Sequence, residues 1–189
     1  MSAEILAPAL PTRFRLTRSH VFVLQRSGLL GDRHYELIDG DLFEKMPQDK
    51  PHATSVRRTT RAFDAIFGAE FVGSQAPIVL DDSNEPEPDV FVTRDTYDSY
   101  SDNPTAADIA LVVEVSDSTL SLDRNAKMRL YAAASIPEYW IVDIEHRRLL
   151  VYLQPQPDGY GNMQTLTETD FIASLHSPQN TLGVIDLLP

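Results

Sequence analysis

The chain has 189 residues, of which 42% are hydrophobic and 23% are charged, a composition that is ordinary for one globular domain with a buried core. It contains no cysteine, which excludes disulfides, thiolate nucleophiles and cysteine-ligated zinc, and which suits a cytoplasmic protein. It contains no long apolar run and no signal-peptide pattern, so we expect neither a membrane span nor secretion.

The net charge of −12 is unevenly distributed along the chain. Residues 1–80 hold ten Lys and Arg against nine Asp and Glu, whereas residues 81–118 hold Arg94 against eleven acids. Proteins that bind nucleic acid usually carry a basic surface, so this balance argues against tight, independent binding to DNA. A cluster of acids is either a solvated loop or a cation site, and for the aspartates of residues 95–108 we expect a solvated loop.

The first elements in chain order are an arm, a short helix and a hairpin. Residues 1–15, which begin rich in alanine and proline, are predicted to form an N-terminal arm, and residues 17–24 a short helix. Two runs of alternating polar and apolar residues follow between residues 35 and 46, joined at Asp39-Gly40. Asp-Gly between such runs is the strongest short-range signal of a β-hairpin.

Alternation within this hairpin predicts which side chains face the core. We expect Leu37, Leu42 and Met46 to share the buried face. Glu36 then lies on the other face.

A helix is predicted next. Apolar residues recur at helical spacing over residues 52–67, and Gly68 is a stop signal. The polar face of this helix carries Arg57, Arg58 and Arg61.

The middle of the chain is predicted to be rich in strands. Residues 71–80 and 89–93 are expected to form strands separated by an acidic turn, and residues 95–107 a surface loop with a helical turn. The run over residues 109–115 is apolar and β-branched apart from Glu114, which is typical of a buried central strand.

The last part of the chain is predicted to hold a helix and a second hairpin. The helix is expected over residues 122–134, and four residues before it are candidate N-caps: Ser116, Ser118, Thr119 and Ser121. Residues 138–143 and 148–153 are expected to pair as a hairpin with Tyr139 and Trp140 in the core. One or two more short strands are expected in the remaining tail.

Glu114 is the first candidate for chemistry. A carboxylate inside a central strand is costly to bury unless it is paired or bound to a cation. One interpretation places it near the exposed end of its strand, hydrogen-bonded to Ser116 or Ser118. Asp89 favours the other interpretation, because it opens a strand that could lie next to that of Glu114. Converging carboxylates repel each other unless a cation bridges them, and oxygen ligands favour Mg²⁺ or Mn²⁺.

Lys127 is the third candidate. It lies four residues after Asp123 on one face of the predicted helix, where the two side chains could form a surface ion pair. The helix also begins near the C-terminal end of the Glu114 strand, so Lys127 could instead reach back over the carboxylates. Two acids, a divalent cation and a lysine suit phosphodiester hydrolysis, because the cation polarises the phosphate and the lysine stabilises developing negative charge.

These residues resemble the PD-(D/E)XK restriction-endonuclease-like nuclease superfamily: Pro88-Asp89, then Glu114-Val115-Ser116 on a later strand, then a lysine. The usual lysine position, two residues after the acid, is Ser116 here, so the lysine would be Lys127 on the following helix.

The wider sequence resembles the Uma-two family of restriction endonucleases over roughly residues 16–155. The segments that carry this resemblance are, in order, Tyr35-Glu-Leu-Ile-Asp-Gly-Asp-Leu42, His52, Pro88-Asp89-Val90, Val112-Val-Glu-Val-Ser-Asp-Ser-Thr119, Asp123-Arg-Asn-Ala-Lys-Met-Arg-Leu-Tyr-Ala132 and Ile136-Pro-Glu-Tyr-Trp-Ile-Val-Asp143.

The resemblance implies an α/β fold with a restriction-endonuclease-like core, in which helices flank a mixed central β-sheet, in a single domain over residues 16–189. It also implies roles for the candidate residues. Asp89 and Glu114 would be the metal ligands, for Mg²⁺ with Mn²⁺ as a substitute, and Lys127 the catalytic lysine. Glu36 would line the same cleft from the hairpin. His52, at the head of its helix, would contact phosphate or orient a ligand.

The implied function is a Mg²⁺-dependent endonuclease that hydrolyses DNA. Arg57, Arg58 and Arg61 would form the clamp on DNA, and a homodimer would place two clamps on one duplex. Asp117 stands where this family usually has proline, which adds a negative charge beside the site.

Two alternatives stand beside the endonuclease. One is a non-catalytic relative that binds a protein partner through its acidic surface. The other is a metal-dependent hydrolase of nucleotides or other phosphate esters. The direction of Lys127 separates the enzyme from the binding protein, because the site is complete only if this lysine points into the cleft.

Overall fold

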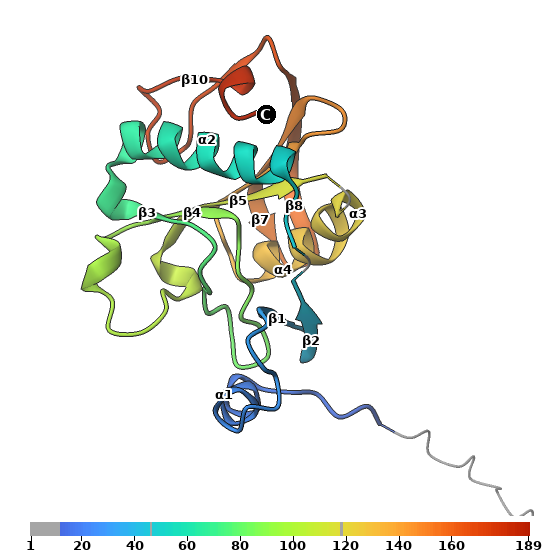
Figure 1. Cartoon of the computed structure of the whole chain (residues 1–189). Helices are drawn as coiled ribbons and strands as arrows, with labels where there is room; N and C mark the ends of the chain where they lie inside the picture. Colours follow the sequence, from blue (N-terminus) through green and yellow to red (C-terminus); the bar gives the residue numbers. More distant parts are fainter. Residues whose placement is uncertain (1–11, 46, 118) are drawn as a thin grey trace, which may run out of the picture.

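The structure is a computed structural model that describes residues 12–45, 47–117 and 119–189. Its centre is a six-stranded sheet with the order β3-β4-β5-β6-β7-β8 (Figure 1). The strands are β3 (Val72–Gly73), β4 (Val90–Thr93), β5 (Ile109–Ser116), β6 (Glu138–Asp143), β7 (Arg148–Gln156) and β8 (Gly159–Thr167). Strands β5 and β6 run parallel and the other neighbours run antiparallel, so the sheet is mixed.

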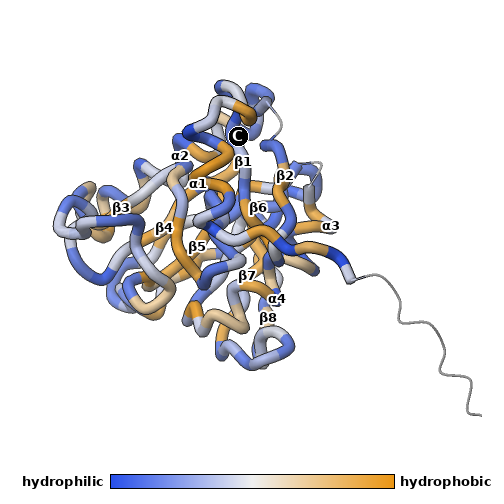
Figure 2. Tube along the Cα trace, turned by 90° about the horizontal axis from the view of Figure 1, so that it is seen from below, coloured by the Kyte–Doolittle hydropathy of each residue, from blue (hydrophilic) through white to orange (hydrophobic). Residues whose placement is uncertain are grey.

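Helices pack on both faces of this sheet. Helix α2 (Lys50–Phe67) covers one face, where Val56 and Phe63 join a cluster of apolar side chains from β4 to β7. Helix α4 (Met128–Ala133) covers the other face, where Tyr131 joins a second apolar cluster. Figure 2 shows the hydrophobic residues concentrated along the central strands. The predicted α/β fold, with a mixed central sheet flanked by helices, is confirmed.

Strand β5 is the buried central strand that the sequence predicts. All eight of its residues are buried, because it has a neighbour on each side and a helix on each face. Side chains alternate along a strand, so Val113 and Val115 pack towards α2 while Val112 packs on the opposite side. Glu114 therefore shares the face of Val112, towards the helical segment that follows β5.

The predicted hairpin is confirmed as β1 (Tyr35–Ile38) and β2 (Asp41–Glu44). Asp39 and Gly40 both have positive φ angles, 50° and 71°, as the tight two-residue turn requires. Leu37 and Glu36 lie on opposite faces, yet both are buried. Met46, predicted on the buried face, lies outside the described residues.

The first helix and the N-terminal arm can be compared only in part. Helix α1 (Arg18–Arg26) confirms the short helix predicted over residues 17–24, and the Thr17 side chain accepts a hydrogen bond from the backbone N–H of His20. Of the arm predicted over residues 1–15, residues 1–11 lie outside the described residues. Arg13 and Arg15 form ion pairs with Asp41 of the hairpin.

Helix α2 begins two residues before the predicted start at residue 52. Asp49 is the N-cap, and its side chain accepts a hydrogen bond from the backbone N–H of His52. Pro51 fits the first turn of a helix, where its missing N–H costs nothing. The helix ends at Gly68, as predicted, with a positive φ of 96°.

The strand predicted over residues 71–80 is wrong for most of its length. Regular pairing covers only β3, because Gln75 has a left-handed backbone with a φ of 51° and Pro77 has no N–H to donate to a ladder. The segment after β3 is held by other contacts instead. The N–H of Gln75 donates to the carbonyls of Pro88 and Asp89, at 3.1 and 3.2 Å.

The helical segment after β5 also starts earlier than predicted. It consists of α3 (Leu120–Leu122), a π-helical turn (Asp123–Lys127) and α4. Its first turn closes at Thr119, whose carbonyl accepts from the N–H groups of Leu122 and Asp123. Ser121 is therefore inside the helix rather than a cap, and Ser118 lies outside the described residues.

The rest of the chain holds the second hairpin and a longer tail than predicted. Strands β6 and β7 pair as expected, and Tyr139 and Trp140 are buried in the core. Three strands, not one or two, follow in the described tail: β8, β9 (Phe171–Ile172) and β10 (Leu182–Gly183). Strand β8 is at an edge of the sheet and largely exposed, so its sequence lacks the apolar run of a buried strand. No helix in the described ranges is long and apolar enough to cross a membrane.

Candidate active site

One pocket of about 350 Å³ collects all the residues predicted to act in catalysis. It opens beside the C-terminal end of β5, between the start of α2, the β1–β2 hairpin and the π-helical turn. Among the residues that line it are Glu36, His52, Asp89, Glu114 and Lys127. These residues are spread over 92 positions of sequence, from 36 to 127, and only the fold brings them together.

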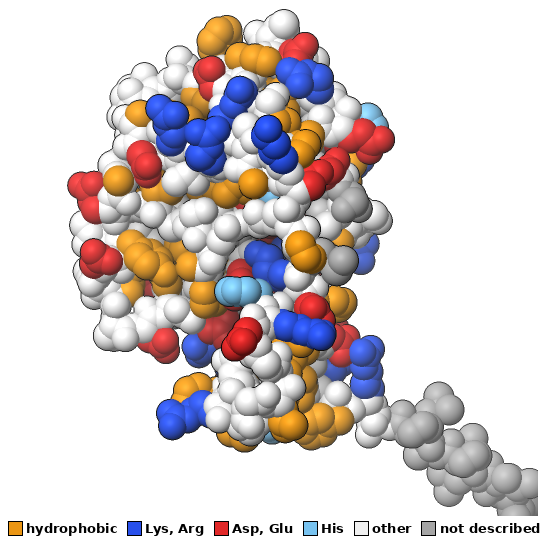
Figure 3. All heavy atoms as spheres, viewed as in Figure 1, with side chains coloured by type: hydrophobic (Ala, Val, Ile, Leu, Met, Phe, Trp, Pro, Cys, Tyr) orange, Lys and Arg blue, Asp and Glu red, His pale blue; other side chains and the backbone are white. Residues whose placement is uncertain are grey.

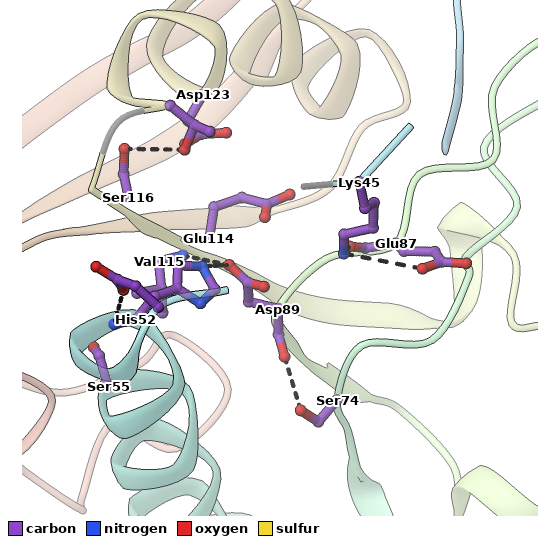
Figure 4. A network of polar contacts seen from close by, with 12 residues as sticks. Lys45, His52, Ser55, Ser74, Glu87, Asp89, Glu114, Val115, Ser116 and Asp123 are labelled. Carbon is purple, nitrogen blue, oxygen red and sulfur yellow. Dashed lines mark hydrogen bonds and ion pairs between the residues drawn. The ribbon is translucent and has the colours of Figure 1, made fainter. Parts of the chain in front are cut away.

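The pairing of β4 with β5 positions Asp89 beside the Glu114 strand. Val90 is opposite Val113 in this antiparallel pair, so Asp89 lies just where the backbone ladder ends. Its Oδ2 atom accepts a hydrogen bond of 2.8 Å from the N–H of Val115 and so replaces the missing ladder partner. Figure 4 shows Asp89, directly before β4, near Glu114 of β5.

Glu114 is held by two donors from the following helical segment. Its Oε1 atom accepts from Lys127 Nζ at 3.0 Å and from the Tyr131 hydroxyl at 2.7 Å. The expected alternative of an exposed strand end is wrong, because Glu114 is buried, and Ser116 faces Thr119 instead of Glu114. Ser118, the other expected partner, lies outside the described residues. Burial raises the pKa of Glu114 to about 8, although the charge of Lys127 acts in the opposite direction.

Lys127 points into the pocket. Its Nζ atom is 3.0 Å from both Glu36 Oε1 and Glu114 Oε1, and only 5% of the residue is exposed. The alternative of a surface ion pair with Asp123 is therefore wrong, since both side chains are buried. Burial alone would lower the pKa of Lys127, but the surrounding carboxylates outweigh it and raise this pKa, so the ammonium stays charged. Lys127 is the last residue of the π-helical turn, a rare conformation that is often found at functional sites.

Glu36 and Lys45 approach from the hairpin. Glu36 Oε1 accepts from the Glu87 N–H at 3.0 Å as well as from Lys127. Lys45 contacts Glu87 (Figure 4), to whose carbonyl it donates at 2.8 Å. It also lies 4.0 Å from Glu36 Oε1. Lys45 was not predicted as a site residue. The sequence feature that could have indicated it is its position directly after the second strand of the hairpin.

His52 sits at the start of α2 and pairs with Asp89. Its Nε2 atom is 3.2 Å from Asp89 Oδ2, while its Nδ1 atom is buried with no partner among the described residues. Burial alone would lower the pKa of His52, but the hydrogen bond and charge of Asp89 raise it. Burial alone would likewise raise the pKa of Asp89, but His52 lowers it. Asp89 is therefore ionised.

Two further residues of the site were not predicted. Tyr131 is one helical turn after Lys127, a spacing that would have placed both on one face. Asp123 also lines the pocket, and its carboxylate accepts from the Thr119 hydroxyl at 2.7 Å and contacts Ser116 (Figure 4). Burial raises the pKa of Asp123.

The donor set of the pocket fits a hard divalent cation. Asp89 Oδ1 and Glu114 Oε2 accept no hydrogen bond from the described residues and remain free for a ligand. No three His, Asp or Glu side chains in the described ranges enclose a metal ion by themselves. Mg²⁺ commonly takes one or two carboxylates and completes its shell with water and substrate phosphate, so two free carboxylate oxygens suit it.

The three predicted DNA-binding arginines separate into two groups. Figure 3 shows Lys and Arg side chains gathered over helix α2. Arg57 and Arg61 are one turn apart and line a second pocket, which has Gln48 in common with the first. Arg58 donates instead to the carbonyl of Leu188, near the C-terminus.

Comparisons with known proteins agree with this fold. The family described as "Uma2: Putative restriction endonuclease" matches residues 24–183. The fold is similar to a crystal structure described as a "putative nuclease belonging to DUF820" from Anabaena variabilis ATCC 29413. That match has a TM-score of 0.63 and 12% identity, and it covers 82% of this chain and 90% of the other. No curated protein matches the chain significantly.

Proposed function

The chain belongs to the Uma2 family, and from this membership and the pocket described above we propose that it is a Mg²⁺-dependent endonuclease that hydrolyses phosphodiester bonds in DNA. Mn²⁺ would substitute for Mg²⁺. The observation that carries the proposal is the position of Lys127, buried in one pocket with Asp89 and Glu114 and bonded to Glu114.

The charge of the pocket supports a cation. Of the described residues that line it, seven are Asp or Glu and two are Lys. A phosphodiester would be repelled by this excess of carboxylates, so substrate binding requires an added positive charge. Asp89 and Glu114 would hold it. The bound ion would supply charge that polarises the phosphate and lowers the pKa of water.

Each remaining side chain has a role that its contacts suggest. The Lys127 ammonium would stabilise the negative charge that develops on the phosphate oxygens. Glu36, hydrogen-bonded to Lys127, would hold that ammonium in place. His52 would keep Asp89 ionised and oriented, because it forms an ion pair with the same carboxylate.

The test is cleavage of plasmid, single-stranded DNA and RNA with Mg²⁺, Mn²⁺ or EDTA. Wild type is compared with Asp89→Asn, Glu114→Gln and Lys127→Met. We expect metal-dependent DNA cleavage that falls by at least about 100-fold in each variant. Asp143→Asn is the matched control, because Asp143 is also a buried aspartate at a strand end but lies outside the pocket.

The outcomes separate the candidate functions. Activity that survives all three substitutions would contradict the proposed site. A folded wild-type chain that cleaves nothing would favour the non-catalytic, protein-binding alternative.

We also propose that the enzyme acts as a homodimer. Arg57 and Arg61 are few for a protein whose net charge is −12, and two subunits on one duplex would double the phosphate contacts. Sedimentation velocity at micromolar concentration, with and without duplex DNA, tests this. A monomer under both conditions would contradict it.

A further inference from the structure

A second pocket, of about 320 Å³, lies beside helix α2 next to the catalytic pocket. Arg57 and Arg61 line it from the helix, and Ser74 and Gln75 line it from the segment after β3. Gln48 lines both pockets, so the two adjoin at this residue. A linear ligand that crosses Gln48 would therefore reach from one pocket to the other.

The two arginines give this pocket its charge. Arg57 and Arg61 are exposed and form no ion pair within the described parts of the chain. Two like charges one helical turn apart destabilise a helix slightly, so a bound anion would be favoured there. Guanidinium groups match the oxygens of a phosphate, to which they can donate paired hydrogen bonds.

Two other residues that line the pocket, Ser74 and Gln75, are hydrogen-bonded to a proposed metal ligand. The Ser74 hydroxyl donates to the Asp89 carbonyl at 2.9 Å, and the N–H of Gln75 donates to the same carbonyl at 3.2 Å. Gln75 has a left-handed backbone, and it is an exposed residue that lines the pocket. A glutamine amide offers both a donor and an acceptor and is a common partner of base edges.

We propose that this pocket binds the nucleotide adjacent to the phosphodiester that is cut. Arg57 and Arg61 bind its phosphate, and Gln75 contacts its base and contributes sequence preference. The inference rests on the proposed function, because it takes the catalytic pocket as the place of the scissile phosphate. Arg58 has no part in this subsite, since it is bonded to the C-terminal segment.

The phosphate contact is tested by binding without cleavage. Fluorescence anisotropy measures the affinity for a labelled single-stranded 12-mer in EDTA, between 50 and 200 mM salt. The same salt series is then measured in Mg²⁺ with proteins that carry Asp89→Asn in addition. The proteins compared are the parent chain, Arg57→Gln/Arg61→Gln and the control Arg58→Gln, on the same helix.

Loss of two phosphate contacts should lower the affinity about tenfold and reduce the slope of log K against log salt by about 1.4. Arg58→Gln should leave both values unchanged. An unchanged slope in the double variant, an equal loss in Arg58→Gln, or no binding by the parent chains would overturn the inference.

The base contact is tested with four 12-mers that differ only at one flanking position. The parent chain should prefer one base by about tenfold, and Gln75→Ala should remove this preference while leaving the salt slope unchanged. Gln164→Ala, an exposed glutamine on β8, is the control. A parent chain without preference, or a preference that Gln75→Ala retains, would contradict the role of Gln75.

Failure of this inference is distinguishable from failure of the proposed function. Binding that depends on Arg57 and Arg61 in a chain that never cleaves would keep the subsite and reject the nuclease. Cleavage by a chain whose binding ignores both arginines would keep the nuclease and reject the subsite.

Discussion

Lys127 shows at the scale of one residue how the site is balanced without a metal. Its ammonium lies between two buried carboxylates, and each charge would be expensive to bury alone. The lysine therefore has two functions that oppose each other. It stabilises the fold by pairing with Glu36 and Glu114. It also competes with the proposed cation for Glu114, because both are positively charged.

The first prediction concerns this balance. Lys127→Met leaves Glu36 and Glu114 without their common cation, so the free energy of unfolding should fall by about 3–5 kcal/mol. Mg²⁺ at millimolar concentration should restore a larger part of this loss than it adds to wild type, because the carboxylates then pair with the ion. Thermal unfolding with Mg²⁺ and with EDTA measures both effects. Equal stabilisation of the two proteins by Mg²⁺ would contradict the proposed ligands.

The second prediction concerns Tyr131, which donates to Glu114 at 2.7 Å. Tyr131→Phe removes only this hydroxyl, so the stability should fall by about 1 kcal/mol and the cleavage rate by about tenfold. Tyr139→Phe is the control, because its hydroxyl donates to the Asp123 carbonyl at 3.2 Å and does not touch a proposed ligand. Timed cleavage assays and denaturant unfolding compare Tyr131→Phe with Tyr139→Phe. A rate that falls equally in the control would reject a specific role for Tyr131.

The residues that sequence could predict are those whose chemistry conflicts with their position. Glu114 interrupts an apolar run, and Asp89 opens a strand, so the order of residues along the chain is enough to single out both. Tyr131 is different, because a tyrosine in an amphipathic helix is usually a core residue. Its hydroxyl becomes informative only when the packing of α4 on β5 places it against Glu114.

At the scale of elements, the hydrogen bonds of Asp143 stabilise the turn between β6 and β7. Asp143 ends β6, accepts from Arg148 at 2.7 Å and from the His146 N–H at 3.2 Å, and is buried. Burial alone would raise the pKa of Asp143, but these hydrogen bonds outweigh it and lower the pKa. A folded pKa below the unfolded one adds stability above about pH 4, and this stability is lost as the pH falls further.

The third prediction follows from this loss of stability at low pH. Asp143→Asn should lower the free energy of unfolding by about 1–3 kcal/mol at pH 7 and make stability less dependent on pH below about pH 4. Urea unfolding between pH 2.5 and pH 7 measures this. Parallel curves for the two proteins would show that Asp143 is not a source of the acid sensitivity.

The fourth prediction concerns the short strand β3. A Cβ atom at Gly73 would lie 2.1 Å from the ring of Phe91, which is buried in the neighbouring strand. Gly73→Ala should therefore cost about 1–3 kcal/mol or more, because a packed ring must move. Gly161→Ala on β8 is the control, since the one close contact of its Cβ would be with the flexible end of Gln156, and the Gln154 carbonyl would lie at an ordinary 3.5 Å. Denaturant midpoints compare the two, and equal costs would contradict the packing at Gly73.

Elements were predictable where one local signal decides the structure. Asp39-Gly40 sets its hairpin, and Gly68 ends α2, in agreement with the sequence. The segment of residues 71–80 was misjudged because its backbone is held by distant partners, the carbonyls of Pro88 and Asp89. Local propensity has no access to such contacts, and the same segment forms the wall of the proposed nucleotide pocket.

Across the whole molecule, acidic and basic side chains occupy different places, which the net charge alone does not reveal. Seven acids line the catalytic pocket, while Arg57 and Arg61 are exposed on α2 and line the neighbouring pocket. Substrate would thus be drawn to the arginines and enter the catalytic pocket only with a cation. Under the proposed function, this arrangement would make metal a condition for binding the scissile phosphate as well as for cutting it.

The fifth prediction is that residues 16–189 unfold as one domain. The hairpin, which carries Glu36, is joined to the rest by Lys127 and by backbone hydrogen bonds between Leu37 and Glu85. The C-terminal end is joined to α2 by the Ser55 hydroxyl, which donates to the Leu187 carbonyl at 2.6 Å. Because the hairpin and the C-terminal segment both contact the rest of the domain, neither should unfold alone.

Calorimetry should show one transition with equal calorimetric and van't Hoff enthalpies. An earlier, separate transition of the hairpin would mean that Glu36 reaches the site only part of the time, and the cleavage rate should then fall at the temperature of that first transition.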